Sequence, residues 1–402
     1  MQDRRQALGI LIGAPLAGAL AWPGLALAGL PGERRLVVVI LRGGLDGLAA
    51  LPPHGDPDYA AQRGSLALPA PGQDGGALDL DGFFGLHPAL PGLHELYRKG
   101  EALALHAMAP PYRGRSHFDA QDVLENGGAG PGAERDGWLN RAVAALDPEG
   151  RRGLGLALGD SVPLVLRGPA KVGSWSPSAL PAPGDALLQQ VAALWDRDPL
   201  LGPGLAEGLR LQDSLGGPIE ERRGLRGLYG PRGFLVFAEK AGQMLALEDG
   251  PRLAVLEMGG WDTHANQGRQ SGRLTNHLKA LDDGLGKLKT ALGTYWKDTA
   301  VVVVTEFGRT VAPNGSGGSD HGVGGAAFLL GGRVAGGRVL ADWPGLSSRR
   351  LHEGRDLRAS GDLRALFKAV LHDHLEIDRR RLDTDVFPES AGLQILRDSF
   401  KT

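Results

Sequence analysis

The chain contains no cysteine among its 402 residues. This absence excludes disulfides, thiolate zinc sites, iron–sulfur clusters and a cysteine nucleophile, so any bound metal must use oxygen and imidazole ligands. Charge of one sign is also lacking, because the formal net charge is only -2. Such a chain has no global field to attract nucleic acid or an anionic membrane, and no nucleic-acid partner is expected.

Glycine and proline are abundant instead, with 64 and 27 residues, and they show no collagen repeat. This composition indicates many tight turns rather than a fibre. Hydrophobic residues make up 42% of the chain, which is enough to bury a sizeable core. No internal repeat or sharp change of composition divides the sequence. We therefore expect residues 29–402 to form a single domain.

The first 28 residues have the pattern of an export signal. Arg4 and Arg5 precede a weakly hydrophobic stretch, residues 7–28, which ends in Ala-Leu-Ala. This pattern predicts a cleavable signal peptide, and the paired arginines favour the twin-arginine route. We expect cleavage after Ala28 and a periplasmic or extracellular protein. The alternative is a membrane anchor, but the prolines and glycines of the stretch disfavour a permanent span.

Short apolar runs alternate with helical periodicity from residue 34 onward. Runs rich in β-branched residues are typical of strands buried on both faces of a parallel sheet. We expect strands at 36–41, 102–109, 164–166, 253–258, 300–305 and 326–330, and helices at 90–99, 117–125, 233–247 and 274–295. This alternation predicts a doubly wound, mostly parallel α/β sheet with ligands outside the carboxyl ends of its strands. Residues 52–87 and 167–231 lack the pattern and are expected to be loop insertions or cover segments.

Polar side chains follow three of the predicted strands. They are Asp46 after 36–41, Asp262 and His264 after 253–258, Glu306 after 300–305, and Asp320 and His321 after a glycine-rich loop. Each acidic residue alone is also explained as a helix cap or a turn residue. Packing these carboxylates together without a cation would be costly, however, because of repulsion and desolvation. The set therefore predicts a divalent metal site, and the histidines favour Zn²⁺ or Mn²⁺ over Mg²⁺ and Ca²⁺.

Ser116 begins a predicted helix and is the candidate nucleophile. A hydroxyl at a helix N-terminus faces unpaired N–H groups and the positive end of the dipole, and beside a metal it can lose its proton and attack. The alternative is that Ser116 only caps the helix, with Arg115 and His117 solvated. Arg42 and Arg309 are candidates to steady developing anionic charge.

These residues, in this order, resemble the family known as domain of unknown function 1501, which is exported by the twin-arginine route, and more widely the alkaline phosphatase and sulfatase superfamily. The resemblance rests on the segments "DRRQ", "LRGGLDGL", "GLHPALPGLHELY", "RSHFDAQD", "GWLNRA", "GGWDTHANQ", "TEFGRT", "SDHG" and "GGRVAGGRV". It implies an alkaline phosphatase-like fold.

The resemblance also implies a set of ligands. It places one metal on Asp46, Ser116, Asp320 and His321, and a second metal on Asp262 and His264. A further downstream histidine for the second metal has no persuasive counterpart, so both one and two ions stay open. Glu306 follows its strand directly and competes for the position where relatives have the Asp.

Two functions of different classes follow from this reading. The first is an exported metal-dependent hydrolase that acts on phosphate or sulfate esters of a small molecule or a polymer. The second is a non-catalytic exported metal-binding or assembly protein on the same fold, with residues 167–231 as a surface for a protein partner. An inactive envelope protein held by an uncleaved anchor is a third alternative.

Overall fold

The computed structural model describes residues 34–150, 153–177, 185–195, 197–198, 201–202, 205 and 229–401. The expected signal peptide, its cleavage site and much of the segment 167–231 lie outside the described residues. Within the described ranges, no helix combines the length and the apolar character needed to cross a membrane.

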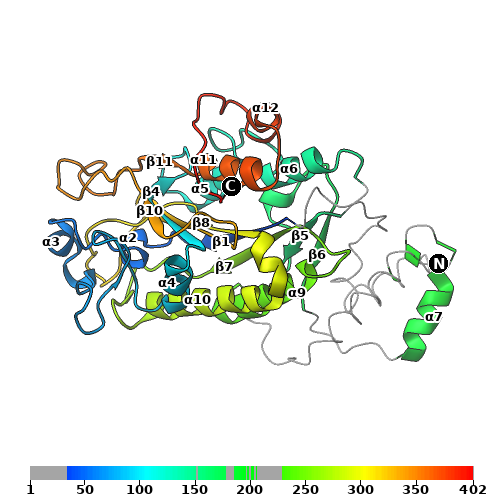
Figure 1. The fold of residues 1–402 in the computed structure, drawn as a ribbon, viewed down its shortest axis with the longest axis horizontal. Helices are drawn as coiled ribbons and strands as arrows, with labels where there is room; N and C mark the ends of the chain where they lie inside the picture. The colour runs from blue at the N-terminus through cyan, green and yellow to red at the C-terminus, as the bar shows by residue number, and fades with distance from the viewer. Residues whose placement is uncertain are drawn as a thin grey trace, which may run out of the picture.

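A nine-stranded sheet forms the centre of the part of the chain that the structure describes (Figure 1). Eight of its strands lie in the order β10-β4-β9-β8-β1-β7-β5-β6, and the ninth, β11, pairs with β4. Its strands are β1 (Arg35–Arg42), β4 (Ala102–Ala109), β5 (Gly155–Leu158), β6 (Val172–Trp175), β7 (Leu253–Gly259), β8 (Thr299–Thr305), β9 (Gly325–Leu330), β10 (Arg338–Leu340) and β11 (Gly361–Asp362). β9 runs antiparallel to β4 and β8, and the other pairs are parallel. The predicted mostly parallel α/β sheet is confirmed.

Helices cover both faces of this sheet (Figure 1). One face carries α4 (Pro91–Arg98), α9 (Pro231–Leu245) and α10 (Arg273–Leu292), and the other carries α5 (His117–Asn126), α6 (Trp138–Leu146) and α11 (Leu363–Ala369). Along β1, Val37, Val39 and Leu41 pack on the first face and alternate residues pack on the second. Successive strand side chains point to opposite faces, so burial on both faces requires the continuous apolar run seen in the sequence.

The remaining elements are short. They are α2 (Gly47–Ala50), α3 (Tyr59–Arg63), α7 (Asp185–Trp195), α12 (Arg379–Arg381), the hairpin β2 (Leu78–Asp79) and β3 (Gly85–Leu86), the 3-10 helices η1 (Gly64–Leu66), η2 (Leu164–Leu166) and η3 (Gly293–Asp298), and the π-helices η4 (Val370–His374) and η5 (Leu382–Val386). α2, α3 and the hairpin belong to the segment after β1. Part of the segment 167–231 joins the sheet, because β6 pairs with β5.

The predicted strand at 164–166 is wrong, because these residues form the 3-10 helix η2. Their buried backbone is paired with side chains rather than with a neighbouring strand. The Val165 N–H donates to Glu125 Oε2 at 3.0 Å, and the Leu166 carbonyl accepts from Asn140 Nδ2 at 2.8 Å. The other predicted strands and helices are confirmed with small shifts of their ends. β5 and β6 were not predicted, since each is a four-residue run that contains glycine.

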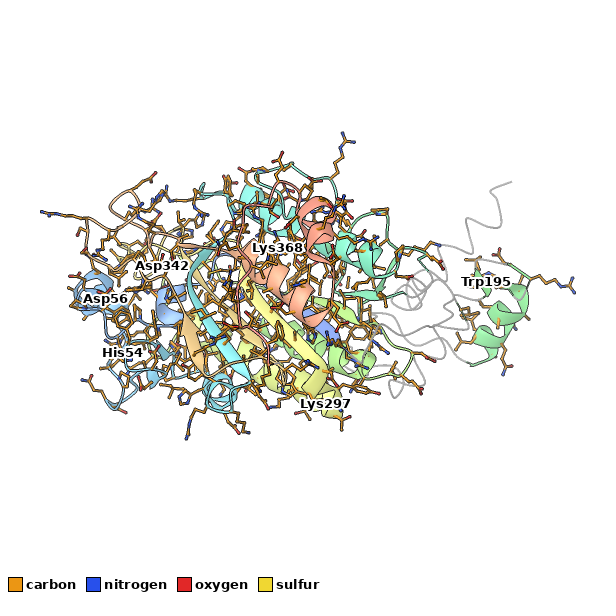
Figure 2. All side chains as sticks on the ribbon, turned by 45° about the horizontal axis from the view of Figure 1, so that its top comes forward. His54, Asp56, Trp195, Lys297, Asp342 and Lys368 are labelled. Carbon is orange, nitrogen blue, oxygen red and sulfur yellow. The ribbon has the colours of Figure 1, made fainter. Side chains whose placement is uncertain are left out.

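The segment 52–87 is held against a distant part of the chain by Asp56, which is buried. Its Oδ2 accepts from Trp343 Nε1 at 2.8 Å and from the Leu346 N–H at 3.1 Å. Figure 2 places His54, Asp56 and Asp342 at one end of the molecule and Trp195 of α7 at the other. The segment predicted as loops is therefore anchored by a buried carboxylate.

Candidate metal centre

Three neighbouring parallel strands deliver their following loops to one edge of the sheet. β1 lies between β7 and β8, with Leu41 opposite both Met258 and Thr305. The chain therefore leaves these strands at the same level, and the loops that begin at residues 43, 260 and 306 lie side by side. The predicted convergence of these loops at a shared edge is present in the structure.

A fold-back of the chain after β8 brings the last histidine to this edge. The Thr310 N–H donates to the Asp320 carbonyl at 2.8 Å, and Arg309 forms an antiparallel bridge with His321. The Gly322 N–H also donates to the Gly308 carbonyl at 2.8 Å. The glycine-rich loop thus closes on itself and returns His321 to the end of β8.

His117, Asp262 and His321 form a cluster in which one ligand atom from each lies within 4.8 Å of the others. His264 stands next to this cluster, because its Nε2 lies 3.0 Å from Asp262 Oδ1 and 2.9 Å from His321 Nε2. We call these four residues the centre. Their side chains are partly exposed, from 24% for His321 to 44% for His264, so a ligand in solution can reach them.

The Nδ1 atom of each imidazole in the centre contacts a hydrogen-bond acceptor. His117 Nδ1 lies 2.8 Å from Glu306 Oε1, His264 Nδ1 lies 2.8 Å from Asp320 Oδ1, and His321 Nδ1 lies 3.0 Å from the Arg115 carbonyl. A neutral imidazole carries one N–H, which in each ring can be donated from Nδ1 to this acceptor. In that tautomer the three Nε2 atoms present lone pairs toward Asp262.

This arrangement fits a metal ion. Metal-binding histidines commonly donate their second ring N–H to a carboxylate or a backbone carbonyl, as all three do here. If both rings carry their hydrogen on Nδ1, the Nε2 lone pairs of His264 and His321 face each other at 2.9 Å, and a cation would remove this repulsion. Three imidazole nitrogens and one carboxylate are a donor set suited to Zn²⁺ or Mn²⁺. The chain would hold such an ion with His117, His264, His321 and Asp262.

Glu306 lies behind His117 and contacts the Nδ1 atom of this ligand rather than the ligand atoms of the centre. The residue is fully buried, and its Oε1 accepts from the Gly43 N–H at 2.8 Å and from Gln121 Nε2 at 3.1 Å in addition to His117. Burial would raise the pKa of Glu306, but the hydrogen bonds from His117 and Gln121 outweigh it and hold the pKa below its ordinary value. The hydrogen bond to Glu306 raises the pKa of His117 against the opposing effect of burial.

Asp262 and His321 have their pKa values shifted by the same surroundings. Burial raises the pKa of Asp262, but the hydrogen bond from Arg309, 2.6 Å from Oδ1, and its charge leave the pKa lowered. Burial lowers the pKa of His321, and the neighbouring His117 lowers it further. Both shifts favour the unprotonated forms that a metal ion requires.

The other residues proposed from sequence have different surroundings. Asp46 is fully buried, pairs with Arg63 and caps α2 through the Ala49 N–H. Asp320 contacts His264, and its Oδ1 also accepts from Asn314 Nδ2 at 2.9 Å. Neither belongs to the cluster of three ligand atoms, although both occupy the same edge of the sheet.

The predicted catalytic residues are engaged by protein groups. Arg42 is bound between Glu125, 2.6 Å from its Nη1, and Glu257, 2.6 Å from its Nε. Arg309 is buried and holds Asp262. Ser116 is the N-cap of α5 and accepts from the Asp119 N–H at 3.4 Å, so the capping alternative describes the contact observed.

His117 is the residue of the centre that sequence reasoning missed. The sequence places His117 only in the alternative in which Ser116 caps the helix and His117 is solvated, because polar residues are common at helix starts. Its partner Glu306 lies 189 positions away in the sequence. The segment "RSHFDAQD" held a signal, since a histidine in the first turn of a helix beside a predicted site can point into it.

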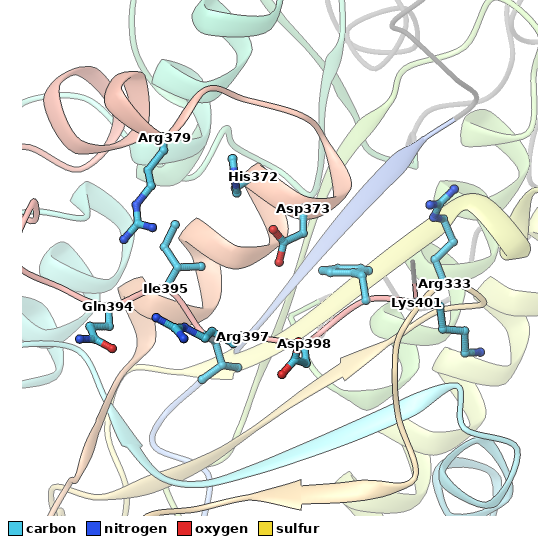
Figure 3. A pocket seen from close by; sticks show the side chains of 11 residues that line it. Arg333, His372, Asp373, Arg379, Gln394, Ile395, Arg397, Asp398 and Lys401 are labelled. Atoms are coloured by element: carbon cyan, nitrogen blue, oxygen red, sulfur yellow. The ribbon is translucent and has the colours of Figure 1, made fainter.

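A hollow with a volume of about 550 Å³ is formed by another set of residues. Figure 3 shows the side chains that line it. It is lined by Arg333, by residues of η4 and α12, and by residues 394–401. None of its lining residues belongs to the centre. The candidate site is therefore defined by the convergence of ligand atoms and not by this concavity.

The profile of the family described as "Protein of unknown function (DUF1501)" matches residues 102–386. The match spans more than half of the chain, and the chain belongs to this family. A search among curated proteins finds no match.

Solved structures show distant similarity. Ps i-CgsB in complex with k-i-k-neocarrahexaose is 14% identical, with 90% of this chain and 77% of that chain covered and a TM-score of 0.40. A protein in the alkaline phosphatase superfamily from Vibrio parahaemolyticus is 13% identical, with 82% and 69% covered and a TM-score of 0.35. Phosphonate monoester hydrolase of Agrobacterium radiobacter is 10% identical, with 86% and 74% covered and a TM-score of 0.36. Values this low do not extend the activities of those proteins to this chain.

Proposed function

We propose that this chain is an exported metal-dependent hydrolase of phosphate or sulfate esters. The observation that carries the proposal is the convergence of three imidazole Nε2 atoms on the Asp262 carboxylate. Each imidazole is oriented by a separate acceptor, which is the arrangement expected of metal ligands. The partial exposure of the centre leaves it open to a substrate.

A divalent ion held there would polarise an ester oxygen and lower the pKa of a bound water. Neighbouring residues of the chain hold the proposed ligands in position. Arg309 fixes the Asp262 carboxylate, while Glu306 and Asp320 fix His117 and His264. A direct role for Arg42 at developing charge would require it to leave its two carboxylate partners. We therefore assign Arg309 a positioning role through Asp262.

Ser116 is the proposed nucleophile because it precedes His117 at the N-terminus of α5. The helix dipole favours an anion at this position, which is where negative charge on the oxygen would develop. Ser116→Ala should abolish hydrolysis of aryl phosphate and aryl sulfate esters. Ser116→Asn is the matched control, since asparagine keeps the helix cap and lacks the hydroxyl. Ser116→Thr keeps both the cap and a hydroxyl.

Metal content tests the centre directly. Elemental analysis of protein purified without chelator should find Zn or Mn, and His117→Ala or Asp262→Asn should reduce the bound metal and the activity together. The control is His94→Ala, which should change neither: His94 lies on α4, and its ring contacts the Asp79 carbonyl of β2. Unchanged metal content in both centre variants would defeat the proposal.

The second candidate is a non-catalytic exported metal-binding or assembly protein on the same fold. It is favoured by one observation, which is that the contact of the Ser116 hydroxyl is a helix-capping bond. In that case Ser116→Asn and Ser116→Ala would retain the role of the protein in the envelope. Residues 167–231 remain the proposed surface for a protein partner.

Export by the twin-arginine route and cleavage after Ala28 are proposals from the sequence pattern. Replacing Arg4 and Arg5 by lysine should block export of a protein expressed in a bacterium with an intact twin-arginine system. Mass spectrometry of the exported protein should give a mature chain that begins at Gly29.

A further inference from the structure

We infer that the guanidinium of Arg63 takes the place of a metal ion at Asp46. This chain therefore holds one divalent ion at this edge of the sheet, and Arg63 is a permanent built-in cation beside it. The count of one ion rests on the proposed metal centre. The exclusion of an ion from Asp46 rests on the contacts of Asp46 itself.

Asp46 is surrounded by hydrogen-bond donors. Its Oδ2 lies 2.5 Å from Arg63 Nη2 and 2.7 Å from Gln267 Nε2, and its Oδ1 accepts from the Ala49 N–H at 3.2 Å. Both side chains of the ion pair are 0% exposed. Both oxygens of Asp46 thus already accept from protein donors, and the buried Arg63 guanidinium would have to leave before a metal ion could take its place.

The orientation of Gln267 is fixed by its other neighbours. Its Oε1 accepts from Thr263 Oγ1 at 2.8 Å and from Ser319 Oγ at 2.7 Å. Since two hydroxyl groups contact the oxygen, the amide nitrogen must face Asp46 and donate to it. Gln267 therefore cannot turn its oxygen toward a cation at Asp46 without losing both hydroxyl contacts.

Arg63 is held in place as firmly as its partner. Its Nη1 donates to the Val311 carbonyl at 2.9 Å and to the Thr310 carbonyl at 3.2 Å. It comes from α3, in the segment 52–87 that Asp56 anchors. A guanidinium stays protonated at any physiological pH, so it supplies a fixed positive charge where an ion could be lost.

The two carboxylates at this edge thus differ in their surroundings. Asp262 also accepts from a guanidinium, that of Arg309, but its side chain is 41% exposed and faces three imidazole nitrogens. Asp46 is fully buried and accepts from protein donors at both oxygens. Ser319 links the two regions, because its Oγ donates to Gln267 and lies 3.4 Å from Arg309 Nε. Asp46 is therefore a positioning residue behind Arg309 and not a metal ligand.

Counting bound ions separates this inference from a two-ion site. The wild-type protein and Asp46→Asn are titrated with Zn²⁺ by calorimetry, and their metal content is measured after gel filtration. We expect one equivalent for both. Two equivalents in the wild type, with one lost in Asp46→Asn, would overturn the inference. The count does not depend on catalytic turnover, so an inactive protein with one ion refutes only the proposed hydrolase.

Replacing the built-in cation gives a second, independent test. Arg63→Ala should lower the midpoint of thermal unfolding, and excess Zn²⁺ should restore part of the loss by occupying Asp46. In the double variant Arg63→Ala/Asp46→Asn, excess Zn²⁺ should not restore the unfolding midpoint in this way. Arg63→Lys should unfold close to the wild type, and Zn²⁺ should not raise its midpoint further. Equal responses to Zn²⁺ in the single and double variants would overturn the inference. If Arg63→Ala does not fold, the ion count of Asp46→Asn decides.

Discussion

Two neighbouring turns of this protein share a sequence pattern and differ in the surroundings of their aspartate. Gly43-Gly44-Leu45-Asp46 follows β1, and Gly259-Gly260-Trp261-Asp262 ends β7, which pairs with β1 in parallel. The Asp46 side chain is 0% exposed beside a guanidinium, whereas the Asp262 side chain is 41% exposed beside imidazoles. A strand followed by two glycines and an aspartate thus indicates where a carboxylate will lie. The side chains that other segments place beside this carboxylate decide its role.

The largest expected effect comes from removing the guanidinium that compensates the charge of Asp46. Arg63→Ala leaves the buried Asp46 charge uncompensated and should lower the free energy of unfolding by about 3–5 kcal/mol in urea titrations. Lys287→Ala is the control, because its ion pair with Glu239 is exposed and should cost about 1 kcal/mol or less. A loss in Arg63→Ala as small as that in Lys287→Ala would contradict the structural role of the pair.

The imidazoles also differ in whether a carboxylate lies beside them. Burial lowers the pKa of His106 and of His374 to about 4, and neither has a carboxylate partner in the described residues. Because the folded-state pKa lies below the unfolded value near 6.5, the unfolded chain binds more protons between these values. Stability is therefore complete above about pH 6.5 and falls as the pH drops toward 4, by up to about 3 kcal/mol for each residue.

The measurement is the free energy of unfolding as a function of pH. His374→Gln keeps a side-chain N–H for the Arg35 carbonyl, which His374 Nε2 contacts at 2.8 Å, and removes the titration. The variant should show a shallower loss between pH 6.5 and pH 4 than the wild type. An unchanged slope would assign the acid sensitivity to other groups.

Changing the orienting acceptor should weaken the centre without removing a ligand. Glu306→Gln keeps the shape of the side chain but loses the charge that fixes the Nδ1–H tautomer of His117. We expect Zn²⁺ affinity to fall about 10–100-fold, as is usual for groups that orient metal ligands. Competition with a fluorescent chelator measures this change. Glu95→Gln on α4, an exposed pair with Lys99, should leave the affinity unchanged.

The smallest expected effect tests the contact between the two turns. Gly43 has a φ of +120°, and an added Cβ would lie 2.6 Å from the Asp262 backbone nitrogen. Gly72 has a φ of +83° with nothing within 4 Å of such a Cβ. Alanine at either position costs stability because of the positive φ. The clash should make Gly43→Ala less stable than Gly72→Ala by roughly a further 1 kcal/mol in thermal or urea unfolding. Equal losses would mean that the two turns can separate freely.

The sheet was predictable because its strands are continuous apolar runs. Burial on both faces leaves only apolar residues in the middle of β1 and β8, at 36–41 and 300–304, so the pattern is unambiguous. The run at 164–166 misled the same reasoning, since it is buried but makes its hydrogen bonds to Glu125 and Asn140. Apolar character predicts burial, and it does not specify which groups satisfy the backbone.

The centre was predictable in part. Asp262, His264 and His321 follow strands or their loops, and the structure brings them together, while their metal binding remains a prediction. His117 was missed because its partner Glu306 lies 189 positions away in the sequence, and Arg63 was missed although Asp46 is only 17 positions away. Arg63 in particular lies in a segment that showed no periodicity, so nothing nearby indicated that it would be buried.

The sequence by itself determined the sheet, the edge at which its polar residues gather and the absence of thiolate ligands. These follow from local periodicity, from the common direction of parallel strands and from composition. Only the tertiary structure decided that Asp46 would be fully buried beside Arg63, and that Asp262 would be partly exposed between Arg309 and the imidazole nitrogens. That choice depends on contacts between residues far apart in the chain, and the free energy of burying a charge is set by those contacts rather than by the residue itself.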